Sequence, residues 1–199
     1  MSAFLGPIHT WLFTKIKFQD ALNKEFVEKL GDRSLKEALD RRYGALEEGE
    51  LAEIIDGSNI HGWLQERISL VENHLAYITL QLKEKDSTNL EKICQVAREF
   101  GKANAENNLE SPRAAYDYLE RLLVNGMPCD RVNALVEDSQ NKLIWEQTIE
   151  IHGQYWKPLG ADVNDYYKIR QAVIEGILED SKISFEQNQA GDFILQMEE

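Results

Sequence analysis

Cysteine is scarce in this sequence of 199 residues, and so are proline and basic side chains. The two cysteines, Cys94 and Cys129, lie too far apart in the chain to form a CxxC metal motif. A chain of this length can bury enough apolar surface to fold without a disulfide or a structural metal. We therefore expect both thiols to stay reduced, as they do in the cytoplasm.

Long apolar runs are also missing. No stretch approaches the roughly 18 consecutive apolar residues of a transmembrane helix. Residues 1–18 lack a charged segment ahead of an apolar run and a small-residue cleavage site, so they do not match a signal peptide. These absences predict a soluble, cytoplasmic protein.

Basic side chains are fewer than acidic ones, since the sequence has 22 Lys and Arg and 35 Asp and Glu, which gives a net charge of −13. Nucleic-acid binding draws most of its affinity from basic side chains that meet phosphates, and anionic membranes attract the same side chains. We expect neither partner. A small-molecule ligand or a protein partner remains open, and the oligomeric state is undetermined.

Apolar spacing and helix-ending residues predict a mainly α fold, a single-domain bundle of about seven helices over residues 1–199. The clearest helix carries apolar residues in steps of three and four, the pattern of a helix packed on its neighbours. Those residues are Ile60, Leu64, Ile68, Val71, Leu75, Ile78 and Leu82. Taken segment by segment, the spacing predicts seven or eight helices, at residues 8–30, 34–42, 48–55, 59–83, 89–103, 112–125, 130–152 and 162–178.

The last stretch of the chain departs from helical spacing. Apolar residues alternate on both sides of a turn-like segment that contains Gly191, which favours a β-hairpin in residues 183–199 packed on the bundle. The alternating residues are Ile183, Phe185, Phe193, Leu195 and Met197. A frayed tail is the competing interpretation.

A five-residue pattern, I-H-x-W-L, occurs twice near predicted helix starts and places His9 and His61 52 residues apart. A third Ile-His pair ends the predicted helix 130–152 with His152. If two helices run parallel and the third antiparallel, the three imidazoles meet at one end of the bundle. Three histidines with an open position are the ligand set of catalytic zinc and of several iron sites.

This hypothesis predicts a divalent metal, Zn or Fe, or a small cofactor at that end of the bundle. The aromatic residues beside the histidines are expected to line the pocket. They are Trp11, Trp63, Tyr155 and Trp156. His74 lies about 20 Å along the helix from His61 and is expected at a helix boundary instead.

Two glutamates offer a separate candidate metal site. On the predicted helix 130–152, Glu146 and Glu150 share the arc of the apolar residues, where a carboxylate is costly unless it is paired or binds a cation. His152 would lie about 160–200° around the same helix. The glutamates and the histidines therefore form separate sites in this interpretation.

The histidines also have a simpler explanation, since His61 falls on the flank of its helix, where histidine commonly faces water. No HExxH, phosphate-loop or G-x-S-x-G motif is present. Two functions therefore stay open. The first is a metal- or cofactor-binding bundle of unknown reaction, and the second is a non-catalytic acidic binding module or chaperone for a partner protein.

Overall fold

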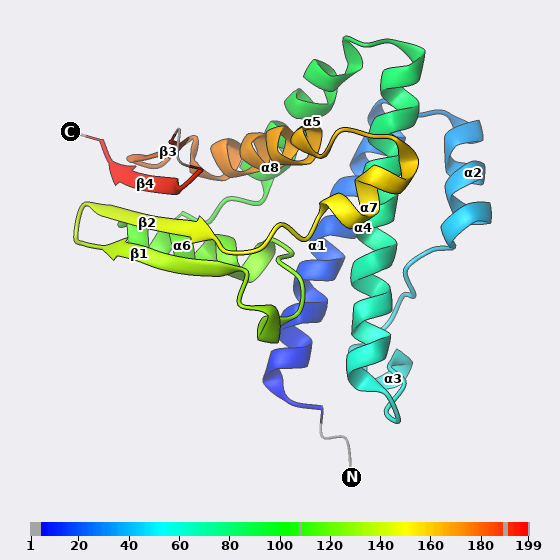
Figure 1. Ribbon diagram of the computed structural model, residues 1–199, viewed down its shortest axis with the longest axis horizontal. Coiled ribbons are helices and arrows are strands. Elements are labelled where there is room, and N and C mark those ends of the chain that lie inside the picture. The colour runs from blue at the N-terminus through cyan, green and yellow to red at the C-terminus, as the bar shows by residue number, and fades with distance from the viewer. Residues whose placement is uncertain (1–4, 108, 189–190, 199) are drawn as a thin grey trace.

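The structure is a computed structural model that describes residues 5–107, 109–188 and 191–198. It is mainly α-helical with a small antiparallel sheet near the C-terminus, as the sequence predicts (Figure 1). The helices are α1 (Pro7–Lys29), α2 (Arg33–Tyr43), α3 (Leu51–Ile54), α4 (Ile60–Lys85), α5 (Asn89–Ala103), α6 (Pro112–Leu122), α7 (Gly153–Trp156) and α8 (Val163–Leu178), with short 3-10 turns at Pro128–Asp130 and Lys157–Leu159.

The two longest helices, α1 and α4, lie side by side and run parallel (Figure 1). Their first turns touch, and further along Asn23 of α1 donates a hydrogen bond to the Val71 carbonyl of α4 at 2.9 Å. The connection between them, residues 30–59, carries the chain back past α2 and α3 to the starting end. All seven apolar residues of the predicted α4 stripe are buried.

The four-stranded sheet has the order β1-β2-β4-β3, from β1 (Asn133–Asp138), β2 (Lys142–Gln147), β3 (Ile183–Gln187) and β4 (Phe193–Met197). The expected C-terminal hairpin is therefore present as β3 and β4, which pair antiparallel. Trp145 of β2 lies opposite Phe193 of β4 and stacks on it at 5.3 Å between ring centroids.

The helix predicted for residues 130–152 is wrong, because this segment forms the hairpin β1–β2. Its polar centre is a turn in which the Ser139 hydroxyl donates to the Lys142 carbonyl. Serine and asparagine favour such turns because their side chains bond to nearby backbone. The alternating burial of Leu143 and Trp145 then supplies an inner face for the sheet.

Apolar side chains gather in two clusters. The larger joins the far halves of α1 and α4 to α2, α5, α6, α8 and the sheet, and the smaller lies between the first halves of α1 and α4. Across residues 5–107, 109–188 and 191–198, no helix combines the length and hydropathy needed to cross a bilayer.

Candidate functional site

The structure brings together two of the three predicted histidines. His9 and His61 lie on the first turns of α1 and α4, and their Nε2 atoms are 3.3 Å apart. His152 lies elsewhere, because its Nδ1 is 3.1 Å from a carboxylate oxygen of Glu72. Glu72 is eleven residues beyond His61 on α4, about 16 Å along the helix axis.

The hydrogen bonds of His9 restrict what its ring can bind. Its Nδ1 accepts the Gly6 backbone N–H at 3.0 Å, so in a neutral ring the proton is on Nε2. A metal ion on Nε2 would require that proton to leave and the Gly6 bond to break. No group of three or more metal-ligating side chains occurs in the described part of the chain. Metal binding by this pair stays a prediction.

The third histidine belongs to a buried polar cluster. His152 and Glu72 are each 1% exposed, and the His152 ring stacks on Tyr166 with centroids 3.7 Å apart. The Tyr166 hydroxyl lies 3.1 Å from the Arg170 guanidinium. Glu72 therefore links the middle of α4 to the short helix α7 and to α8 through side chains alone.

The two predicted glutamates do not share a helix. Glu146 is exposed on β2, and Glu150 lies in the loop that follows it. The Glu150 carboxylate accepts the backbone N–H groups of His152 and Gly153, at 2.8 and 2.9 Å, so it holds the start of α7. Its role in this structure is local capping.

The predicted pocket-lining aromatics occupy different environments. Trp11 lines a cavity between α1 and α6, which is described further below. Trp63 packs against Phe13 in the smaller apolar cluster with the two rings tilted by 50°, and the Tyr155 hydroxyl lies 3.3 Å from the Ser69 hydroxyl. Trp156 is fully buried in the larger cluster.

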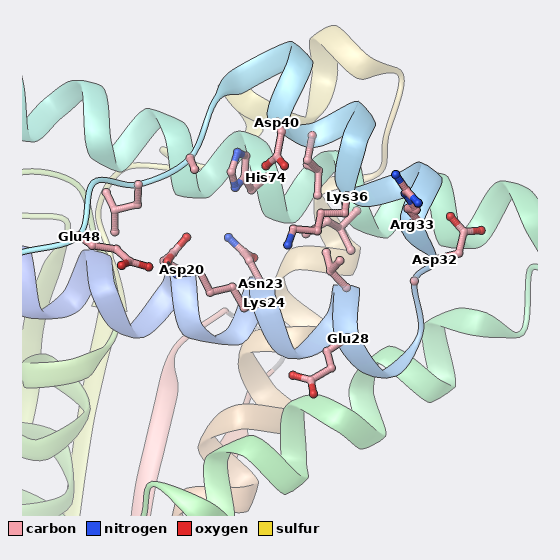
Figure 2. Close-up of a pocket in the computed structure, with 16 residues that line it drawn as sticks. Asp20, Asn23, Lys24, Glu28, Asp32, Arg33, Lys36, Asp40, Glu48 and His74 are labelled. Atoms are coloured by element: carbon pink, nitrogen blue, oxygen red, sulfur yellow. Dashed lines mark ion pairs between the residues drawn. The ribbon is translucent and has the colours of Figure 1, made fainter.

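A cavity of about 760 Å³ lies between α1, α2 and α4, and its rim includes the chain that follows α2. We call it the α1–α2–α4 cavity. Figure 2 shows Asp20 and Asn23 of α1 reaching toward the space that His74 of α4 and Asp40 of α2 also face. This volume is typical of a site for a small organic ligand.

Asn23, which lines this cavity, leaves a buried hydrogen-bond acceptor unused. The side chain is 2% exposed, and its amide Nδ2 donates to the Val71 carbonyl, which fixes the orientation of the amide. Its Oδ1 has no hydrogen-bond partner among the described residues. A buried carbonyl oxygen without a partner is costly, and a ligand donor would satisfy it.

Two further acceptors line the cavity near Asn23. Asp20 is 6% exposed and forms an ion pair with Lys24 at 2.8 Å. The Nε2 of His74 lies 3.1 Å from the Gly44 carbonyl, so Nε2 is the donor and Nδ1 is left as an acceptor in the neutral ring. Burial lowers the pKa of His74 and keeps the ring neutral at neutral pH.

The rest of the lining is part acidic and part apolar. Among the charged side chains, the carboxylates outnumber the basic groups: Asp20, Glu28, Asp32, Asp40 and Glu48 against Lys24, Arg33 and Lys36. Val27, Leu39, Leu46 and Ile78 supply apolar walls from α1, α2, the chain after α2, and α4. The cavity therefore offers acceptors and negative charge beside hydrocarbon.

One wall of this cavity has a recognisable sequence feature, which is a stripe of buried residues on α1 that includes polar side chains. The predictions based on the histidines did not include this stripe. Leu12, Ile16, Gln19, Asn23 and Phe26 follow steps of four and three along α1, and all five are buried. Two polar residues in an otherwise apolar stripe indicate that this part of the core contains hydrogen-bonding groups that need partners. His74, expected at a boundary, is in fact 7% exposed.

Comparisons with protein-family models, with curated proteins and with solved structures found no match to this chain.

Proposed function

We propose that this protein binds a small organic amine in the α1–α2–α4 cavity. The observation that carries the proposal is the buried Asn23 Oδ1, an acceptor with no partner among the described residues. An ammonium group has three donors and no acceptor, which suits a site lined by Asp20, Asn23 and the neutral His74 ring.

The charges and the walls of the cavity support the same class of ligand. Five carboxylates and three basic side chains line it, so a cation lowers the electrostatic energy of the site. Val27, Leu39 and Ile78 give a short hydrocarbon chain an apolar surface to cover. An acidic protein of net charge −13 also attracts cations from a distance.

Isothermal titration with n-hexylammonium chloride tests this function. We expect saturable binding to the wild-type protein, whereas hexanoate, which has the same chain length and the opposite charge, does not bind. In Asp20→Asn the shape of the side chain is kept and its charge is lost. We expect the affinity to fall about tenfold or more, since a charged hydrogen bond contributes roughly 1.5–3 kcal/mol.

Glu25→Gln is the matched control, because Glu25 lies on the same helix, pairs with Lys29 and does not line the cavity. It removes the same unit of charge from outside the cavity and should change the affinity less than about twofold, because solvent and salt screen a distant charge. Circular dichroism checks that both variants fold. Equal binding of hexanoate and hexylammonium, or equal loss in both variants, would contradict the proposal.

A further inference from the structure

A second cavity, of about 550 Å³, lies between α1, α6 and the segment that leads into β1. We call it the Lys15 cavity, after a lysine that lines it and is only 2% exposed. It shares no lining residue with the α1–α2–α4 cavity. A failure of the amine-binding proposal would therefore leave the inference about Lys15 standing.

The Lys15 ammonium is buried with few polar neighbours. Its Nζ lies 4.1 Å from the centroid of the Trp11 ring and 3.9 Å from the Glu120 carboxylate, which is too long for a hydrogen bond. Burial lowers the pKa of Lys15 to about 8, Glu120 acts in the opposite direction, and the nearby Arg170 lowers it further. At pH 7 about a tenth of such amines are neutral, against fewer than about one in a thousand for an exposed lysine.

Glu120 is held in place to exchange a proton with this amine. Its Oε1 accepts the side-chain amides of Asn125 and Asn133, at 3.0 and 2.7 Å. Its Oε2 is the oxygen that faces Lys15. Two hydrogen bonds from side-chain amides to Oε1 fix the orientation of the carboxylate, and they leave Oε2 free to interact with Lys15.

Tyr116 adds a proton donor to the wall of the same cavity. Its side chain is half-buried, and burial raises its pKa to about 12, so the phenol keeps its proton at neutral pH. A protonated phenol can donate to the oxygen of a carbonyl group. A nucleophilic amine, a carboxylate and a phenol thus line one pocket large enough for a small organic molecule.

We propose that Lys15 forms an imine with a small aldehyde or ketone that enters the Lys15 cavity. The neutral Nζ attacks the carbonyl carbon, a C–N bond forms, and the C=O π pair moves to the oxygen, which takes the proton of the Tyr116 hydroxyl. Glu120 accepts the proton lost by the nitrogen and returns it to the hydroxyl group. That group leaves as water while the nitrogen lone pair forms the C=N bond of an iminium ion. The last N–H proton then returns to the Tyr116 oxygen, so one carbonyl compound and one amine give one imine and one water.

Acetaldehyde with sodium cyanoborohydride tests the proposal, because the hydride traps the imine as a stable ethylated lysine. Peptide mass spectrometry then measures labelling at each lysine of the folded wild-type protein, so the result does not depend on a variant that folds. At pH 7 we expect Lys15 to be labelled on the order of tenfold faster than Lys17, which is exposed on the same helix. Labelling of Lys15 no faster than that of Lys17 would overturn the proposal.

Glu120→Gln separates proton transfer from a purely structural role. Without the carboxylate, the pH midpoint of Lys15 labelling should move to lower pH, since Glu120 raises the lysine pKa. The limiting rate at high pH should fall about a hundredfold, the usual contribution of a positioned acid or base. Glu106→Gln, a carboxylate paired with Arg121, is the control and should change neither quantity. An unchanged rate and midpoint in Glu120→Gln would remove Glu120 from the step.

Discussion

Several polar side chains in the core of this protein have an atom that makes no hydrogen bond to the described residues. Gln19 and Asn23 on α1, and Glu72 on α4, each keep a polar atom without a partner among the described residues. Each such atom costs free energy that an apolar residue of similar shape would not. Residues that break the local pattern in this way are expected at functional sites, which agrees with an amine ligand at Asn23.

At the residue scale, His74 makes the stability of the protein depend on pH. Burial lowers its pKa below the ordinary value near 6.5, while Asp20 and Asp40 oppose this shift and Lys24 adds to it slightly. Above about pH 6.5 the ring is neutral in both states. As the pH falls below that value the unfolded chain takes up a proton first, so the free energy of unfolding decreases until the pH passes the lower folded pKa.

His74→Gln should therefore make the free energy of unfolding less dependent on pH in this range. We expect a loss of about 1–2 kcal/mol at pH 7, where the bond to the Gly44 carbonyl is weakened, and a smaller further loss between about pH 6.5 and 5 than in the wild type. Urea unfolding at a series of pH values measures both. A variant that is as pH-dependent as the wild type over this interval would show that another group titrates there.

At the scale of elements, helix ends were predictable because capping is a local interaction. The side chains of Asp32, Ser111 and Asp162 accept backbone N–H groups at the starts of α2, α6 and α8, as their sequence positions indicate. The prediction failed at residues 130–152, where the apolar residues suit both helix and strand spacing. There the pairing of Trp145 with Phe193 decides the structure, and their 48-residue separation hides it from local patterns.

Two glycines let α5 and α8 approach with their backbones in contact. A Cβ on Gly101 would lie 2.1 Å from the Val173 carbonyl oxygen, and one on Gly176 would lie 2.0 Å from that of Arg98. Because backbone atoms cannot move aside as a flexible side chain can, Gly101→Ala and Gly176→Ala should each force the helices apart. We expect each to lower the free energy of unfolding by about 1–3 kcal/mol, despite the better helix propensity of alanine.

Gly57→Ala is the control for these two substitutions. No atom lies within 4 Å of a Cβ at this position, and its backbone is not in the left-handed region. Its unfolding midpoint in urea should match that of the wild type within about 0.5 kcal/mol. A Gly101→Ala protein as stable as Gly57→Ala would show that the two helices can separate at little cost.

At the scale of the whole molecule, the polar residues on the buried face of α1 mark one wall of the α1–α2–α4 cavity, but the sequence alone could not place its other walls. Its walls come from three helices and the chain after α2, and only their packing brings Asp20 and His74 to one space. The repeated I-H-x-W-L pattern correctly suggested that two parallel helices begin side by side, since His9 and His61 touch. The position of His152 depended on the wrongly predicted helix, so its distance from them could not be anticipated.

The net charge of −13 gives the last prediction, because it acts on every cation that approaches the acidic cavity. In the proposed site, n-hexylammonium is attracted by Asp20 nearby and by many more distant carboxylates, and added salt screens the distant ones first. We expect the affinity to fall a few-fold, about three- to tenfold, between 0.05 and 0.5 M NaCl, as the Debye length shrinks from about 14 to 4 Å. Titration calorimetry at four salt concentrations measures how steeply the affinity falls with added salt.

Hexan-1-ol, which can cover the same apolar wall without a charge, should bind as well or slightly better at high salt, because salt does not weaken apolar burial. If hexylammonium and hexanol respond alike to salt, charge makes no contribution to the site, and Asp20 and its acidic neighbours are not what holds the ligand.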